Sequence, residues 1–475
     1  MMQMVEMPLW LLLLILVLAV VAALDKVMIP SVRWYFRRRL ERAVARLNTR
    51  LERPIQPFKL ARRHDMIQRL IYDPEVTAAV QASSRETGVP ENVVFQEATR
   101  YAREIVPSFS AFAYFGFAIR AARFLSNAVY RVRLGHVDEE ALRQIDPEAT
   151  VVFVMNHRSN MDYVLVTYLA ADQSALSYAV GEWARVWPLS RLIRAMGAYF
   201  IRRKSRSDLY RSVLACYVRH ATEAGVTQAI FPEGGLSLNG ELGRPKLGLL
   251  KYIVDTHQQS ERDVVFVPVA LNYDRVLEDT VLTAASGKAE RRFNARIGVI
   301  AGWMIKHGWL RMTGRAHRFG YAAVSFGAPI SLKQFQAETT REATVELSRH
   351  LMRRIGALVP VLPVPLVAFL LLRHGSMSRT ALLHEVDKFL ERHPDAYVHM
   401  PRHDRAYGLE VGLRQLLERR IVVETNGHLE PSAERRNLLE FYANSINHLV
   451  QQPDEARVSP QNSATASEIS AIAGS

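Results

Sequence analysis

The chain has 475 residues, a formal net charge of +14, and 49% hydrophobic residues. This length can hold two or three domains with a large core. The positive charge favours anionic partners: phosphorylated substrates, acidic lipid, an acidic carrier protein or nucleic acid. Cys216 is the only cysteine, which excludes an internal disulfide and a cysteine-based zinc site of the usual kind and fits a reducing compartment.

An uncharged, almost wholly apolar segment runs from Met7 to Leu24. As a helix it would reach about 27 Å, close to the roughly 30 Å hydrocarbon core of a bilayer. No Lys or Arg precedes it, and basic residues are frequent between Lys26 and Arg46. We therefore predict a single-pass transmembrane anchor within residues 1–30, with the rest of the chain in the cytoplasm. A cleaved signal peptide is the rival interpretation, but the segment lacks a basic start and a clean Ala-x-Ala site.

Residues 31–145 have the patterns of a helical N-terminal region. Between Pro107 and Leu134, a cluster of aromatic residues gives way to interleaved arginines. This mixture is typical of an interfacial helix on anionic lipid. A helix that packs on the following domain, with its arginines in water, explains the pattern equally well.

In residues 146–345, apolar patterns typical of strands alternate with apolar patterns typical of helices. Strands are predicted at 150–155, 176–180, 197–201, 226–231, 264–271 and 320–327, and helices at 161–171, 183–195, 207–223 and 247–257. This alternation indicates an α/β domain with a mainly parallel sheet and helical crossovers.

The most informative residues follow the strand at 150–155. His157 is expected in the turn after this strand, at the sheet edge where ligands bind in open α/β sheets, and Asp162 in the first turns of the next helix. A histidine in the turn can fold back onto the aspartate, which leaves its other ring nitrogen free as a general base. A structural histidine that caps the helix is the plainer interpretation.

Four segments together resemble the glycerolipid acyltransferases, in particular the bacterial membrane type of glycerol-3-phosphate acyltransferase. The first is His157-Arg158-Ser159-Asn160-Met161-Asp162-Tyr163. The others, in that family's order, are 197–203, Phe231-Pro232-Glu233-Gly234-Gly235 with Ser237 and Gly240, and Val267-Pro268-Val269. Residues 439–449 resemble a block late in the same enzymes.

The resemblance implies transfer of an acyl chain from acyl-CoA or acyl carrier protein to the sn-1 hydroxyl of glycerol 3-phosphate, the first step of phospholipid synthesis. His157 would be the general base and Asp162 would orient it. Substrate-binding residues would be Arg158, Ser159, Arg202, Arg203, Glu233, Gly234, Ser237, Lys246 and Pro268. No metal or cofactor is expected, and the site would lie on the cytoplasmic side of the inner membrane, where anionic lipid is a further partner.

Three features depart from simple expectations. Leu236 and Leu238 stand where the bacterial enzymes usually carry arginines, so phosphate recognition would pass to other cations, with Arg244 and Lys204 as further candidates. Ser237 does not fit the Gly-x-Ser-x-Gly nucleophile elbow, because its segment is one residue too long. Pro268 is unusual in a central strand, so it either bends the strand near the thioester or marks an edge strand.

Residues 346–450 predict a helical C-terminal domain. Its apolar stretch at 357–372 is broken by prolines and too short for a confident membrane span. Helices at 379–392 and 407–420, a strand and turn at 421–427, and a helix at 432–448 resemble a winged helix. We prefer a cap on the enzyme domain, and expect no nucleic acid, because the anchor and the four segments account for the charge. Residues 451–475 are predicted to be a disordered tail.

Two other functions stay open. An acyltransferase could act on dihydroxyacetone phosphate, a lysophospholipid or another alcohol. The chain could also be a membrane-anchored binding protein without turnover, although the intact His157–Asp162 pair argues against this.

Overall fold

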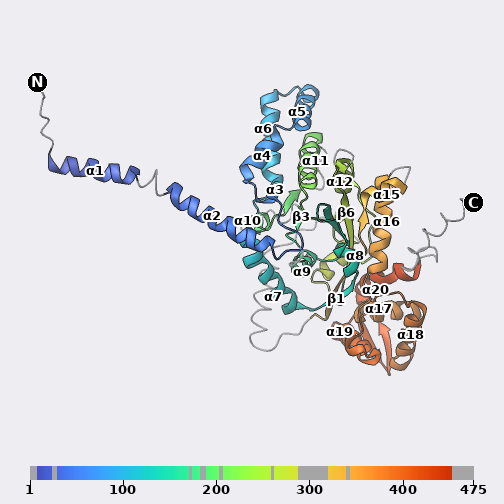
Figure 1. Cartoon of the computed structure of the whole chain (residues 1–475). Helices are drawn as coiled ribbons and strands as arrows, with labels where there is room; N and C mark the ends of the chain where they lie inside the picture. The colour runs from blue at the N-terminus through green and yellow to red at the C-terminus, as the bar shows by residue number, and fades with distance from the viewer. Residues whose placement is uncertain are drawn as a thin grey trace, which may run out of the picture. The chain divides into compact units, whose positions relative to one another are not determined.

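The computed structural model describes residues 8–23, 29–170, 174–181, 189–202, 207–257, 261–286, 319–338 and 343–451 (Figure 1). It divides into two units, residues 1–55 with 172–174 and residues 56–171 with 175–475. Each unit is described by itself. The expected disordered tail lies, after Gln451, outside the described residues.

The first unit contains α1 (Leu9–Ala23) and α2 (Ile29–Asn48). α1 falls within the expected anchor, but part of that segment is outside the described residues. Among the helices of the described residues, none combines the length and the apolar character needed to cross a bilayer. The anchor therefore stays a prediction.

The second unit combines one large sheet with helices. Its strands are β1 (Arg131–Val137), β2 (Thr150–Met155), β3 (Ser177–Gly181), β4 (Tyr199–Ile201), β5 (Gln228–Ile230), β6 (Val264–Tyr273), β7 (Tyr321–Phe326), β8 (Ile330–Ser331), β9 (Met377–Ser378), β10 (Val422–Thr425) and β11 (His428–Pro431). Its helices up to the end of the sheet are α3 (Pro57–Leu60), α4 (Arg63–Ile71), α5 (Pro74–Thr87), α6 (Glu91–Ile105), η2 (Phe112–Ala118), α7 (Ile119–Val129), α8 (Glu139–Arg143), α9 (Met161–Leu169), α10 (Leu189–Ala195), α11 (Asp208–Glu223), α12 (Gly248–His257) and α13 (Asp279–Ser286). The later ones are α15 (Leu332–Glu338), α16 (Ala343–Leu358), α17 (Pro363–His374), α18 (Arg379–Arg392), η4 (Pro401–His403), α19 (Arg405–Glu418), η5 (Ala433–Arg435) and α20 (Arg436–Gln451).

The described strands of the large sheet follow the order β1-β7-β6-β2-β5-β3-β4, and β8 pairs with β6. β2 lies parallel to both β5 and β6, and β3 lies parallel to β4 and β5. Among the described strands, β7 and β8 pair antiparallel with β6, and β1 runs in the same direction as β7, with which it pairs in parallel. Each strand predicted from the sequence is present within a few residues, so the prediction of a mainly parallel sheet is confirmed.

Pro268 lies inside β6, a strand with neighbours on both sides. On one side it is in register with Val154 of β2. On the other side, β6 pairs with β8 up to Phe266 and with β7 from Val269, so Pro268 falls between the two partners. Its carbonyl there accepts a hydrogen bond from Gly327 N at 2.8 Å. Proline has no N–H to donate, so an interior strand tolerates it at this point, where one pairing partner ends and the next begins. The interpretation of Pro268 as the mark of an edge strand is therefore wrong.

β1 was not predicted, because its sequence lies in the region expected to be helical. It follows α7 directly and pairs in parallel with β7. Most of its side chains are exposed at the sheet edge, so it lacks the apolar alternation of a half-buried strand. Gly135 permits the close pairing, since a Cβ at this position would collide with Ser325 Oγ.

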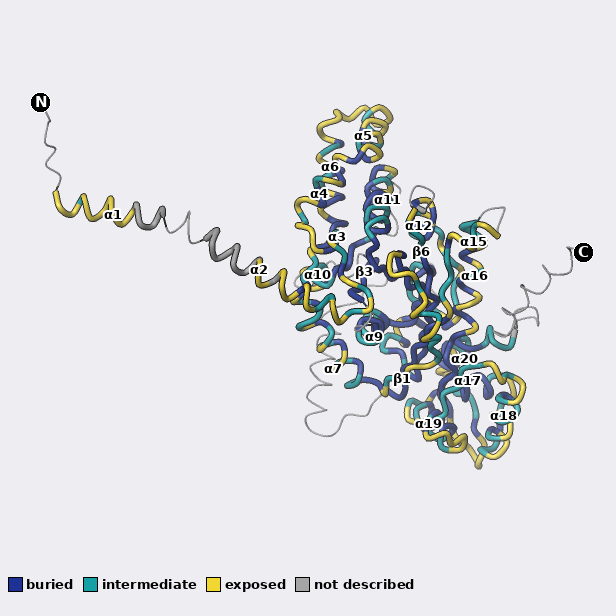
Figure 2. Tube along the Cα trace, viewed as in Figure 1, coloured by how far each residue is buried: buried dark blue, intermediate teal, exposed yellow. Residues whose placement is uncertain are grey.

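The C-terminal part follows the predicted order of helix, helix, hairpin and helix. α18 and α19 precede the hairpin β10–β11, which β9 extends to three strands, and α20 follows. α17, from the proline-broken apolar stretch, is buried along most of its length and packs against α19 and α20 (Figure 2). Asp274, just after β6, accepts a hydrogen bond from Val364 N in the first turn of α17 at 2.9 Å. The C-terminal helices are thereby joined to the central sheet.

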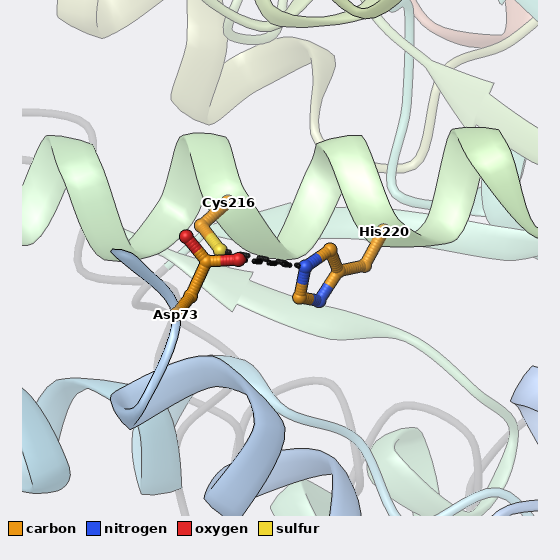
Figure 3. Close-up of side chains that lie close together, drawn as sticks. All are labelled: Asp73, Cys216 and His220. Carbon is orange, nitrogen blue, oxygen red and sulfur yellow. Dashed lines mark hydrogen bonds and ion pairs between the residues drawn. The ribbon is translucent and has the colours of Figure 1, made fainter. Parts of the chain in front are cut away.

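A polar cluster joins the turn between α4 and α5 to α11 (Figure 3). Asp73 caps α5 by accepting from Glu75 N at 3.0 Å, and its other oxygen lies 3.0 Å from His220 Nε2. Cys216 Sγ lies 3.8 Å from the same nitrogen, one helical turn away. Such groups can hold a metal ion. Here, however, Arg219 lies 2.9 Å from Asp73 Oδ2 and 3.7 Å from Cys216 Sγ. The positive charge beside Asp73 is therefore supplied by an arginine of the chain itself.

Lys59 in α3 is a buried lysine, with 7% of its surface exposed. Its Nζ donates to the Ala175 carbonyl at 2.7 Å and lies 4.7 Å from the centroid of the Phe109 ring. Gly197 makes room for it, because a Cβ there would lie 2.8 Å from Lys59 Cε. Burial disfavours the ammonium ion and lowers the pKa of Lys59 to about 7.

Replacement of Lys59 by Met should remove a pH dependence of stability. The pKa of Lys59 falls from 10.5 to about 7 on folding, so between these values the unfolded state binds a proton that the folded state has lost. The free energy of unfolding of the wild type should therefore rise with pH from about 7 to 9, by up to roughly 1.4 kcal/mol per pH unit relative to Lys59→Met. Urea unfolding across this range measures the difference. Lys251→Met, which replaces an exposed lysine of α12, should keep the wild-type slope, and parallel curves for wild type and Lys59→Met would contradict the lowered pKa.

Candidate active site

Residues 156–160 join β2 to α9; we call them the catalytic turn because they contain His157, the predicted general base. β2 is buried along its whole length because its residues are apolar and mostly β-branched. Asn156 ends the strand and pairs with the β6 backbone: its Nδ2 donates to the Leu271 carbonyl at 3.0 Å, and its Oδ1 accepts from Leu271 N at 2.8 Å. This double hydrogen bond holds the start of the turn against the neighbouring strand.

His157 and Asp162 meet as predicted from the sequence. His157 Nδ1 lies 2.9 Å from Asp162 Oδ2, and both side chains are almost completely buried. The same oxygen accepts from Arg158 N at 2.7 Å and Ser159 N at 3.0 Å, so the turn wraps around one carboxylate oxygen. Within the described part of the chain, the other ring nitrogen, Nε2, has no hydrogen-bond partner. This is the arrangement that a general base requires.

Tyr273 completes the environment of Asp162 and was not predicted. Its hydroxyl donates to Asp162 Oδ1 at 2.5 Å, from the last residue of β6. Both groups are completely buried, and burial beside Asp162 raises the pKa of Tyr273, which keeps the hydroxyl protonated as a donor. The signal for it was present: Asn272-Tyr273-Asp274 is a polar run at the end of a buried strand, close to where the catalytic turn stands relative to β2.

Two aromatic rings hold the imidazole of His157. Phe231 stacks on it, with ring centroids 4.1 Å apart, and Tyr163 meets it edge-on at 5.4 Å. Phe231 and Tyr163 also line a cavity of about 250 Å³. His157 therefore adjoins this cavity through its two aromatic neighbours.

Glu233 lies in the third of the four acyltransferase-like segments, residues 231–240, which we call the third motif. It connects the catalytic turn to the following loop. Its carboxylate accepts from His157 N and from Gly243 N, each at 2.8 Å. Burial raises the pKa of Glu233, and these two backbone donors oppose the shift. The predicted role of Glu233 is substrate binding. These contacts give it a second role, which is to hold the backbone of His157 in place.

Lys246 lies across the third motif. Gly234 has a positive φ of 65°, and a Cβ on it would lie 2.8 Å from Lys246 Cδ and 3.2 Å from Nζ. Both residues line the cavity, where Arg202 and Arg211 bring further positive charge and the rest of the lining is mainly apolar or aromatic. The cavity thus combines a surface suited to an acyl chain with cations suited to a phosphate.

Ser237 lies beside the catalytic turn but its hydroxyl is occupied. Its Oγ donates to the Glu241 carbonyl at 2.7 Å, and its N–H donates to the His157 carbonyl at 3.0 Å. Leu236 and Leu238 are partly buried against the hydrophobic core. The loop therefore supplies backbone contacts around His157 and no cation at these two positions.

The arginines expected to bind phosphate differ in their surroundings. Arg202 makes a bidentate ion pair with Glu104 of α6, at 2.9 and 2.7 Å, and this carboxylate raises the pKa of Arg202. Arg203 and Lys204 lie outside the described residues, and Arg244 is exposed. The positive charge of Arg202 is therefore already balanced by the carboxylate of Glu104.

Arg158 and Ser159 point away from the imidazole. Arg158 is 3% exposed, donates through Nη1 to the Gly240 carbonyl, and has no partner for Nε and Nη2 within the described part of the chain. Ser159 Oγ donates to Glu278 at 2.8 Å. Pro268, expected near the thioester, lies within β6 and is not part of the cavity lining described above.

Comparisons with known proteins show which families the sequence resembles. Residues 136–272 match the family model described as Acyltransferase, and residues 308–454 match the Glycerol-3-phosphate acyltransferase C-terminal region. Similar proteins include the glycerol-3-phosphate acyltransferases of Pasteurella multocida, 27% identical over 83% of this chain and 51% of that protein, and of Xylella fastidiosa, 28% identical over 70% and 40%. The chain thus spans about half the length, or less, of these curated relatives.

A solved structure, the 1-acyl-sn-glycerophosphate (LPA) acyltransferase PlsC from Thermotoga maritima, matches with a TM-score of 0.32 and 19% identity, over 51% of this chain and 76% of that one. The family matches cover both the region of His157 and the C-terminal helices. The expected resemblance is confirmed: residues 136–272 are similar to the Acyltransferase family, and residues 308–454 are similar to the C-terminal region of the glycerol-3-phosphate acyltransferases.

Proposed function

We propose that this chain transfers an acyl chain from acyl-CoA or acyl carrier protein to the sn-1 hydroxyl of glycerol 3-phosphate. The observation that carries the proposal is the buried His157–Asp162 pair beside a cavity with both apolar and cationic walls. The names of the relatives support glycerol 3-phosphate as the acceptor. The reaction would be the first step of phospholipid synthesis.

His157 is the general base in this proposal. Its Nε2 takes the proton from the acceptor hydroxyl, and the oxygen attacks the thioester carbonyl. The carbon–sulfur bond then breaks, and the thiolate leaves with the proton that the imidazolium returns. Asp162 stabilises the imidazolium through the 2.9 Å contact at Nδ1. The bond from Ser237 Oγ to Glu241 favours direct transfer over an acylated serine.

Lys246 is the cation that we assign to the acceptor phosphate. Its side chain lies against Gly234 and lines the cavity. Its backbone N–H donates to the Pro232 carbonyl at 2.8 Å. Arg202 also lines the cavity, but its ion pair with Glu104 would have to be shared or broken to bind a second anion. Lys246 would thus replace the positive charge that Leu236 and Leu238 do not provide.

The protein is proposed to act at the cytoplasmic face of an inner membrane, with α1 as part of its anchor. A second surface would contact anionic lipid: Phe112, Phe117 and Phe124 on η2 and α7 are exposed by 78, 57 and 63%, and Arg120 and Arg123 are exposed beside them. Exposed aromatic rings with adjacent arginines suit a bilayer interface. An enzyme placed there would release its acylated product without exposing the chain to water.

One observation keeps a second acceptor open. Leu236 and Leu238 pack against the core, so the third motif presents no arginine at these positions. Another acceptor, such as dihydroxyacetone phosphate or a lysophospholipid, would then be used by the same His157 chemistry. Thioester consumption by the purified protein, with a panel of acceptors, separates these alternatives from a binding protein without turnover.

Removal of the base should abolish chemistry while binding survives. We expect His157→Ala to lower kcat by about two to four powers of ten, and Asp162→Asn to be damaging because it keeps the shape but loses the charge. Single-turnover kinetics with labelled acyl thioester should show label passing to the acceptor without acyl-protein. Ser237→Ala is the matched control and should be mild. If label accumulated on the protein and Ser237→Ala or Cys216→Ala removed it, His157 would be activating a nucleophile of the protein instead.

Loss of Lys246 should affect the acceptor more than the donor. Lys246→Ala removes a charge-assisted contact worth roughly 1.5–3 kcal/mol, so the KM for glycerol 3-phosphate should rise about 10- to 100-fold while the KM for the thioester changes little. Steady-state kinetics on both substrates measures this split. Lys251→Ala, in the helix α12 that begins two residues after Lys246 but outside the cavity lining described above, should behave as wild type. A wild-type acceptor KM in Lys246→Ala, together with a raised KM in Arg202→Ala, would move phosphate binding to Arg202.

The anchor has a topological test. The full chain should stay with membranes through high-salt washing, because apolar burial is insensitive to salt, and residues after Lys26 should be cytoplasmic. Replacement of Leu13 and Ile15 by arginine should release the protein into the soluble fraction. A C-terminal reporter that is active only in the periplasm would reject the proposed orientation.

A further inference from the structure

The catalytic turn is held on its outer side by a residue of a different segment. Glu278, directly before α13, accepts from Ser159 Oγ at 2.8 Å, from Asn160 Nδ2 at 3.0 Å and from Asn160 N at 3.3 Å. Ser159 Oγ in turn accepts from Met161 N at 3.1 Å, at the start of α9. Glu278 therefore fixes Ser159 and Asn160, the last two residues before the helix that carries Asp162.

The neighbouring residue, Asp279, is bound by the C-terminal region. Arg419, just after α19, lies 2.7 Å from Asp279 Oδ2, and the hydroxyl of Tyr442 in α20 donates to the same oxygen. Arg419 Nη1 also donates to the Tyr442 hydroxyl at 3.0 Å. Asp279 and Tyr442 are buried and the Arg419 side chain is 15% exposed, so this is a mostly buried charge pair with a third polar partner. Removal of one member of such a group leaves the others unsatisfied and is therefore damaging.

A second set of contacts joins α20 to the third motif. Asn444 Nδ2 donates to the Asn239 carbonyl at 2.9 Å. Gly240, with a φ of 88°, lies directly under α20, and a Cβ there would collide with the Phe441 carbonyl. The Phe441 ring lies 5.1 Å from the guanidinium carbon of Arg158. One helix thus contacts both the loop that holds His157 N–H and the arginine next to His157.

We propose that the C-terminal region positions the catalytic turn, through Arg419 and Tyr442 acting on Asp279 and then through Glu278 acting on Ser159 and Asn160. This inference rests on the proposed function, since it assigns positioning residues for the same reaction. None of these groups touches the imidazole. Their effect is on the geometry between His157 and Asp162, and an error of about 1 Å in such geometry can cost up to roughly a hundredfold in rate.

Tyr442→Phe tests the proposal, because it removes one hydroxyl and keeps the ring in the core. We expect kcat to fall about tenfold, with the KM of both substrates within about twofold of wild type. Asp279→Asn, which keeps the size of the side chain, should behave similarly. Ile446→Val, a change at a fully buried position of the same helix, should lower the unfolding temperature slightly and leave kcat unchanged.

A double-mutant cycle separates positioning from general destabilisation. If the effect of Tyr442 passes through Glu278, then Tyr442→Phe should change kcat little in a Glu278→Gln background. Independent effects would multiply instead, and this outcome would overturn the proposed connection. So would a wild-type kcat in both Tyr442→Phe and Asp279→Asn.

Hydrogen exchange of the full chain gives a readout that does not depend on activity. In Tyr442→Phe, the peptide covering residues 156–163 should exchange faster, while peptides of β2 and β5 keep their wild-type rates. Exchange that rises equally throughout the sheet would show that the hydroxyl has only a stabilising role. If the wild type does not acylate glycerol 3-phosphate, the proposed function fails, but the exchange experiment still decides whether the C-terminal region orders the turn.

Discussion

The site depends on one buried carboxylate. Asp162 accepts hydrogen bonds from two backbone N–H groups and from Tyr273, in addition to its contact with His157. Burying this carboxylate without partners would greatly reduce the stability of the folded state. The backbone at residues 158–159 must therefore fold around it and donate hydrogen bonds. The same contacts leave one nitrogen of the imidazole for the substrate. The fold of the turn and the orientation of the base therefore have a single electrostatic cause.

The large sheet could be predicted because its interior strands are apolar and rich in β-branched residues. β2 and β6 are buried on both faces, so their sequences are continuous apolar runs. β1 is an exposed edge strand, and its arginines resemble those of the preceding helix. The tolerance of Pro268 depends on where β7 ends and β8 begins, which is a property of pairing between distant segments that no local pattern encodes.

The predicted contact between His157 and Asp162 is present, because the spacing of these two residues is local. His157 and Asp162 are five positions apart, and a strand, a turn and a helix suffice to bring them together. Tyr273 and Glu278 reach the turn from more than a hundred residues away, so periodicity could not place them. Arg202 was a reasonable phosphate ligand by residue type, but its partner Glu104 is nearly a hundred residues earlier, and the ion pair is visible only in the folded chain.

The polar cluster on α11 has a consequence for thiol chemistry. Burial and the neighbouring Asp73 carboxylate raise the pKa of Cys216, so the thiolate that would react with disulfides or oxidants is scarce. The reaction proposed for this chain would set free one thiol in every turnover if the donor is a coenzyme A thioester. With its only cysteine buried and protonated, this chain would not form mixed disulfides with that product, nor would it be inactivated when the surrounding thiol pool becomes oxidised.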